Sequence, residues 1–101
     1  MGIQFGESEM KLIEVVASLN TIPDEETIYA AEPWSPNSEA ITAPEPDTGG
    51  VPPRAEEAGM HYFLEVFLAK QFLEGWERTQ RTLPSVDSKS RRLIEYAIND
   101  A

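Results

Sequence analysis

One stretch of the chain, Met60–Gln80, combines large aromatic and aliphatic side chains from which a hydrophobic core can be built. It reads MHYFLEVFLAKQFLEGWERTQ, holds about half of the chain's aromatic residues and has little charge until its end. The chain before it is acidic, rich in proline and short of bulky apolar side chains. Because burial of apolar surface drives folding, we expect the interior to be organised around this stretch.

Two structures fit this central stretch. It can form one buried helix from Met60 to Gln80, or a strand over Met60–Leu64 followed by a helix from about Val66 to Thr79. The second is favoured because the run HYF at 61–63 prefers strands to helices. A third strand would also support the hairpin predicted earlier in the chain, since a lone hairpin is marginally stable in water.

The predicted helix after this strand has apolar residues at helical spacing. They form one line four residues apart, with a second line beside it, and both are expected to be buried: Leu68, Phe72 and Trp76, then Val66, Ala69 and Leu73. Gly75 costs about 1 kcal/mol relative to alanine within a helix. We therefore expect Gly75 to pack closely against a neighbouring element.

Prolines and β-forming residues predict a hairpin in the first half. Thr27–Glu32 and Glu39–Ala43 read as its strands, bounded by prolines. Between them Ser35, Pro36 and Asn37 suit a type I turn. Residues 44–59 follow as an acidic loop rich in proline and glycine, interpreted as a mobile surface connection with one helical turn over 54–58.

Helices are predicted at both ends of the chain. Glu7–Leu19 reads as an amphipathic helix with Ser8 as its cap, after an alternating pair, Ile3 and Phe5, that suits an edge strand. A final helix starts at Ser85 or Asp87 and runs to about 99. Its expected inward stripe is apolar: Leu93, Ile94, Ala97 and Ile98. The 101 residues thus predict a single α+β domain: an N-terminal helix, a small antiparallel sheet of about three strands and two C-terminal helices.

Charge is the most informative part of the composition. The formal net charge is −10, and residues 1–57 carry all of this excess, whereas 58–101 are balanced. Direct nucleic-acid binding is not expected because the basic footprint it needs is missing. A basic protein partner would instead be attracted to the first half. Arginines cluster around the last helix–helix connection and are interpreted as ion-pair partners for the acidic half, either within one chain or across a dimer: Arg78, Arg81, Arg91 and Arg92.

Several classes of protein are excluded or disfavoured by what the sequence lacks. The chain has no cysteine, so disulfides, thiol catalysis and thiolate metal sites are excluded. It has no apolar run long enough for a membrane span and no secretory signal, so we expect a cytoplasmic protein. The segment PEPDTGG lacks the ligand spacing of a calcium loop. No cofactor, metal or catalytic constellation is predicted.

Two sets of candidate site residues remain. The first is a partner contact made of one turn aromatic and four acids: Trp34, Glu25, Glu26, Glu45 and Asp47. The second is a small-ligand pocket between helix and sheet: Tyr29, His61, Tyr62 and Trp76. His61 is the single histidine and would need a carboxylate beside it for acid–base chemistry. Trp34 is expected either to fold onto the core or to anchor a contact, and the tyrosine hydroxyls are expected to reach water.

Three segments together resemble a known family. PDEETIYAAEPW, MHYFLEV and RLIEYAINDA follow one another in the order seen in a family of small acidic bacterial proteins of unknown function, some of which look like accessory or immunity-type proteins. The resemblance covers about half of the chain and implies a compact α+β fold in which the middle segment leads from strand to helix. It carries over no functional residue.

The sequence therefore favours a non-enzymatic interaction domain with an acidic surface, of which an immunity or antitoxin-like inhibitor is a sharper version. A homodimer is also expected to be feasible, because a small sheet leaves apolar surface and open edges. The alternative is a small-ligand-binding protein or a minor enzyme that uses the pocket set.

Overall fold

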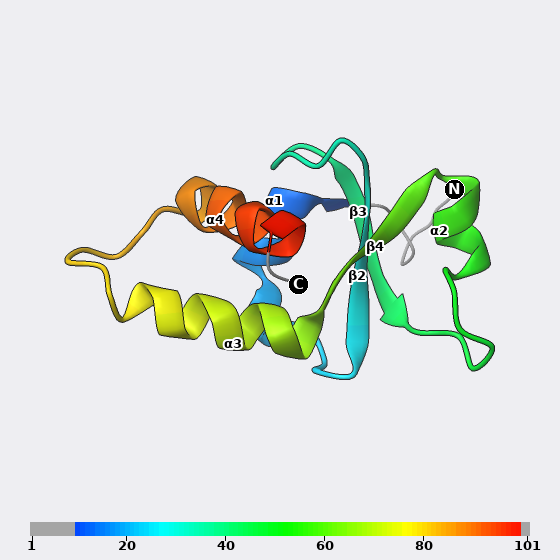
Figure 1. The fold of residues 1–101 in the computed structure, drawn as a ribbon, viewed down its shortest axis with the longest axis horizontal. Coiled ribbons are helices and arrows are strands. Elements are labelled where there is room, and N and C mark those ends of the chain that lie inside the picture. Colours follow the sequence, from blue (N-terminus) through cyan, green and yellow to red (C-terminus); the bar gives the residue numbers. More distant parts are fainter. Residues whose placement is uncertain (1–9, 100–101) are drawn as a thin grey trace, which may run out of the picture.

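A computed structural model describes residues 10–99 as one antiparallel sheet with helices on both faces. Figure 1 shows α1, α3 and α4 on one side of the sheet and α2 on the other. The strand order is β1-β3-β2-β4. The strands are β1 (Met10–Lys11), β2 (Glu26–Ala31), β3 (Glu39–Pro44) and β4 (Met60–Glu65). The helices are α1 (Leu12–Ala17), the 3₁₀ turn η1 (Leu19–Thr21), α2 (Pro53–Glu57), α3 (Val66–Glu77) and α4 (Val86–Asn99). The predicted α+β class is confirmed.

The hairpin is also confirmed and supplies the two central strands. β2 pairs antiparallel with β3, with Tyr29 opposite Ile41. The connecting turn closes through the amide of Ser38, which donates to the carbonyl of Ser35 at 3.0 Å. β4 pairs with the other side of β2, so the hairpin gains the third strand that it needed.

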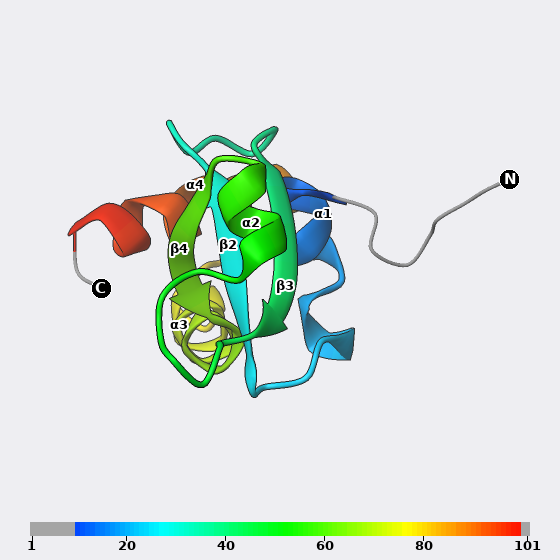
Figure 2. The ribbon, with the colours of Figure 1, turned by 90° about the vertical axis from the view of Figure 1, so that its right-hand side faces the viewer.

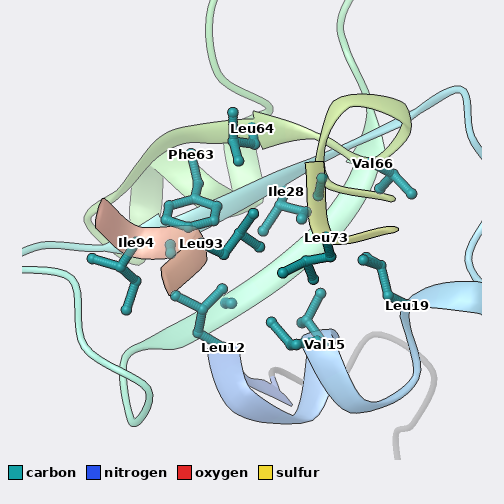
Figure 3. Packing of buried hydrophobic residues seen from close by; sticks show 14 residues of the cluster. Leu12, Val15, Leu19, Ile28, Phe63, Leu64, Val66, Leu73, Leu93 and Ile94 are labelled. Carbon is teal, nitrogen blue, oxygen red and sulfur yellow. The ribbon is translucent and has the colours of Figure 1, made fainter. Parts of the chain in front are cut away.

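Both faces of β2 are buried, and this defines two cores. Ile28 and Ala30 belong to the larger cluster, under α1, α3 and α4 (Figure 3). Tyr29 belongs to a smaller cluster under α2, together with Ile41 and Met60. A strand that is covered on both faces reads as a continuous apolar run rather than an alternating one, which matches TIYAA in this strand.

The strand-then-helix interpretation of the central stretch is confirmed, with one irregularity. The register of β4 against β2 shifts between Ile28 and Tyr29. Tyr62 lies opposite Tyr29 and Leu64 opposite Ile28, so Phe63 is the extra residue of a β-bulge. Phe63 and Leu64 consequently both enter the larger cluster (Figure 3).

The predicted inward face of the following helix is partly wrong. The fully buried line of α3 is Val66, Ala69 and Leu73, whereas Leu68, Phe72 and Trp76 are half-buried. The line that faces the sheet begins at Val66, the residue directly after β4. Phe72 instead stacks on Tyr96 of α4 with ring centroids 4.2 Å apart.

The expectation for Gly75 is wrong as well. A Cβ placed at Gly75 would meet no atom within 4 Å, so no close helix contact requires glycine there.

The N-terminal helix is shorter than predicted. Glu7 and Ser8 lie outside the described residues, as do Ile3 and Phe5. Within them, Met10 and Lys11 form β1, pairing with Ala40 and Glu39, and the helix begins only at Leu12. Met10 and Lys11, which were predicted as helix, are extended instead. Pairing with β3 gives their backbone groups hydrogen bonds that the end of a helix would lack.

The last helix is confirmed in position but not in its whole inward stripe. Its cap is Ser85, whose hydroxyl accepts a hydrogen bond from the amide of Ser88 at 3.0 Å. Leu93 and Ile94 are buried, and Ala97 packs at the margin of the core. Ile98 is 63% exposed, because the end of α4 extends past the sheet (Figure 2).

The acidic loop contributes more to the fold than predicted. Its expected helical turn is present as α2, and Ala55 of this helix is buried against the sheet. Val51 packs onto the same cluster. Segment 44–59 is therefore the second covering layer of the sheet.

Two phenylalanines four positions apart provide a matched test of this packing. Phe63 is 1% exposed and Phe67 is 47% exposed. We predict that Phe63→Ala lowers the free energy of unfolding by about 3–5 kcal/mol, the usual loss for a buried phenylalanine. Phe67→Ala should cost less than about 1 kcal/mol. Urea denaturation measures both, and equal losses would show that the bulge does not place Phe63 in the core.

Candidate functional site

The basic side chains of the second half are neutralised locally. Five lysine or arginine ion pairs occur in the described residues: Lys70–Asp24 at 2.6 Å, Arg78–Glu74 at 3.3 Å, Lys89–Glu77 at 3.0 Å, Arg91–Asp87 at 2.8 Å and Arg92–Glu95 at 3.0 Å. Four of the five use acids of α3 and α4 themselves. Within one chain, the interpretation of the arginines as partners for the acidic half is therefore wrong for Arg78, Arg91 and Arg92.

The four predicted contact acids remain without such partners and gather at one end of the sheet. Within residues 10–99, no lysine or arginine nitrogen lies within 4.0 Å of Glu25, Glu26, Glu45 or Asp47. Glu26 opens β2 opposite Pro44 at the end of β3, so Glu45 follows beside it. The antiparallel hairpin thus joins acids that are about twenty residues apart in the chain. We call these four residues the acidic end.

Burial and nearby carboxylates raise the pKa of two tyrosines on the sheet. Partial burial raises the pKa of the Tyr62 phenol above its usual 10.0, and the carboxylates of Glu65 and Glu45 raise it further. Burial also raises the pKa of Tyr29, with Glu45 adding to the effect and Thr27 opposing it. Negative charge near a phenol disfavours the phenolate, so both shifts have the expected sign.

Trp34 lies at the opposite end of the hairpin from these acids. Its Nε1 donates to the carbonyl oxygen of Ala30 at 3.1 Å, and its ring meets Phe63 edge-on with centroids 4.8 Å apart. The indole is half-buried and still lines two open surface hollows, one with Pro33 and Ile98. Trp34 is therefore anchored on the core, and the structure does not bring it together with the acidic end.

The predicted pocket set is divided between the two faces of the sheet. Tyr29 lies under α2, and Tyr62 pairs opposite it at the surface. Trp76 packs at the margin of the larger cluster on the other face. His61 is exposed, with its Nε2 3.9 Å from Glu32 Oε1. The four side chains do not line a common cavity among the described residues.

A different hollow does include His61. It has a volume of about 460 Å³ and lies between the loop, α2 and β4, with Glu56 and Gly49–Val51 in its wall. A second hollow of about 310 Å³ is lined by Lys70, Lys89 and Glu77 among others. In the described part of the chain, no cluster of three histidine or acidic side chains could hold a metal ion.

The hydroxyl of Tyr29 was expected to reach water, and this expectation is wrong. The side chain is fully buried, and among the described residues its hydroxyl has no hydrogen-bond partner. No pattern in TIYAA distinguishes this tyrosine from a core-edge one, because its burial depends on the loop folding back over the sheet.

The outer edge of β4 was not anticipated by the sequence. The strand order leaves β4 with β2 on one side and no strand on the other within residues 10–99. Exposed apolar side chains lie near this edge: Tyr62 on β4 and Phe67 in the first turn of α3. A third strand was predicted, but strand order depends on long-range packing that local patterns do not encode.

Comparison with family models, curated proteins and solved structures finds no match to this chain. None of the helices in the described range is long and apolar enough to cross a membrane. The surface itself therefore provides the basis for a functional proposal.

Removal of the buried Tyr29 hydroxyl tests whether it lacks a hydrogen-bond partner. Because an unpaired buried hydroxyl is unfavourable, we predict that Tyr29→Phe leaves the free energy of unfolding unchanged or raises it by up to about 1 kcal/mol. The folded phenol has the raised pKa, so the unfolded chain loses its proton first and wild-type stability falls as the pH rises above 10.0. Tyr29→Phe should remove part of this fall. Urea denaturation at neutral and alkaline pH measures both effects, and a loss above about 1 kcal/mol at neutral pH would contradict the account.

Proposed function

We propose that the protein is a non-enzymatic interaction domain that presents an acidic surface to a basic protein partner. The observation that carries this proposal is the separation of charge: four of the five lysine or arginine ion pairs use acids of α3 and α4, and the acidic end has no basic partner in the described structure. Unpaired charges of one sign attract an oppositely charged partner and speed its association.

The contact has a polar part and an apolar part. The acidic end supplies the long-range attraction, whereas Trp34, held by Ala30 and Phe63, offers a rigid aromatic contact at the other end of the hairpin. Anchored aromatics often carry much of the binding energy of an interface. An immunity or antitoxin-like inhibitor that covers a basic toxin is the sharper form of this proposal, in line with the resemblance described above.

The acidic end can be tested against a matched loss of charge elsewhere. The test variant is Glu25→Gln/Glu26→Gln/Glu45→Gln/Asp47→Asn, and the control is Glu74→Gln/Glu77→Gln/Asp87→Asn/Glu95→Gln. The probe is a fluorescein-labelled octalysine peptide, followed by anisotropy. We expect the test variant to weaken binding about tenfold more than the control, since each removed contact charge contributes up to about 1 kcal/mol.

Salt provides the second readout for the same probe. Binding to the wild-type chain should weaken steeply between about 50 and about 500 mM NaCl, because mobile ions screen exposed charges. Equal binding by the two variants, or binding that is independent of salt, would overturn the proposal. Thermal unfolding followed by circular dichroism confirms that both variants are folded.

A small-ligand-binding protein is the second candidate, and one observation favours it. The hollow of about 460 Å³ beside the loop is large enough for a small ligand and has His61 and Glu56 in its wall. A cationic ligand would suit this wall. A thermal-shift screen of small amines should then show stabilisation that is reduced in His61→Ala and in Glu56→Gln. No stabilisation of the wild-type chain would remove this candidate.

A further inference from the structure

We propose that the outer edge of β4 is the docking site for an extended, basic segment of a partner protein, which joins the sheet as a further strand. This inference rests on the proposed function and specifies where and how the partner binds. It concerns the outer edge of β4, which reaches the acidic end at Glu65, because Glu65 pairs with Thr27, the residue after Glu26.

The backbone of β4 provides the first argument. β4 is six residues long and occupies the end of the sheet, with β2 as its one strand neighbour in the described structure. A strand in this position has a row of backbone N–H and C=O groups that point away from the sheet. Such a row pairs readily with an extended peptide, whose main chain supplies the matching groups. Figure 2 shows β4 at the side of the sheet, with α2 in front of the sheet and α3 behind it.

Apolar side chains provide the second argument. Four large apolar side chains are highly exposed in the described residues, among them Tyr62, Phe67 and Ile98. Tyr62 belongs to β4, and Phe67 follows in the first turn of α3. In Figure 2 the end of α4, whose last turn includes Ile98, lies on the β4 side of the molecule. Exposed apolar groups gathered on one side of a protein are typical of an interaction site.

Charge provides the third argument and identifies the partner. Glu65 ends β4, and Glu32 lies at its other end, beside His61. Neither acid has a lysine or arginine partner within residues 10–99. Thr27 and Tyr29 share one face of β2, so their partners Glu65 and Tyr62 share that face too. The edge therefore has an acid at each end and an aromatic ring between them.

The preferred peptide follows from this arrangement. A strand rises about 3.4 Å per residue, so the ends of β4 are about 17 Å apart. A segment with lysine or arginine at both ends of a run of about six residues would place one cation near each acid. β-branched residues between the two cations would lie beside Tyr62.

The same charges disfavour a second copy of this chain at the edge. Pairing β4 with its own copy would bring the carboxylates of two chains, each with a net charge of −10, to one interface. Like charges placed opposite one another on paired strands are destabilising. We therefore expect no homodimer through β4, and the test includes such a dimer as the competing outcome.

The test uses two labelled peptides that differ in their backbones alone. The parent is fluorescein-labelled KVTVTVK, and the analogue carries N-methyl groups on alternate residues, which removes the amides on one side of the strand. Both keep the same charges and side chains. We expect the parent to bind the full chain and the analogue to bind at least about tenfold more weakly, because each strand hydrogen bond contributes about 0.5–1.5 kcal/mol.

A pair of protein variants locates the peptide. Glu32→Gln/Glu65→Gln removes the acids at the ends of β4, whereas Glu39→Gln/Glu74→Gln removes the same charge elsewhere. The first pair should weaken binding of the parent peptide about five- to tenfold, and the second should have little effect. Sedimentation equilibrium of the free chain gives its oligomeric state.

The outcomes of the peptide and variant experiments distinguish failure of this inference from failure of the proposed function. Equal binding of the two peptides, or equal loss in the two variant pairs, overturns strand addition at β4 and leaves the acidic interaction domain intact. Absence of binding by KVTVTVK while octalysine binds overturns this inference alone. Absence of binding by both peptides overturns the proposed function as well. A dimer that Glu32→Gln/Glu65→Gln strengthens assigns the edge to a second copy and contradicts the inference.

Discussion

The fold depends on one constraint: β2 is covered on both faces and paired on both edges. Its residues from Thr27 to Ala30 are all buried. Ile28 and Ala30 require the three helices on one side, while Tyr29 requires α2 and its loop on the other. β3 and β4 then supply the backbone hydrogen bonds that a strand removed from water must have. Removal of any one of these layers would expose part of β2.

The distribution of charge follows from this arrangement. The interior takes the apolar side chains of both halves, so the acids of the first half are left at strand ends, on the loop and on α2. The bases of the second half lie mostly on helices, where acids three or four residues away neutralise them. Folding therefore preserves the charge asymmetry of the sequence, and among the described residues the acidic end has no lysine or arginine partner.

Local signals in the sequence predicted the elements well. Prolines on either side bound both hairpin strands, and the aromatic run at 61–63 predicted β4 with its helix to follow. Information on long-range packing was missing. The bulge at Phe63 brings two consecutive residues of β4 into the larger core, and α3 directs Val66, Ala69 and Leu73 inwards. Pairing with β3 makes Met10 a strand residue.

The candidate site shows the same limit. The four acids were predicted as a group, and the hairpin brings them together. Trp34 was grouped with them, but it lies at the other end of β2 because the turn is there. Tyr29 and Trp76 were placed in one pocket, although they lie on opposite faces of the sheet. Strand order, which sequence periodicity does not contain, determines that β4 is at the edge.

Native-state hydrogen exchange along β4, followed by NMR on the free chain, tests the central claim most directly. If β4 is paired with β2 and open on its outer side, slow and fast amides should alternate along Met60–Glu65 on either side of the bulge at Phe63, while amides of β2 should all exchange slowly. Uniform slow exchange along β4 would show that its outer edge is already covered. Fast exchange throughout β2 would contradict the buried central strand on which the whole structure depends.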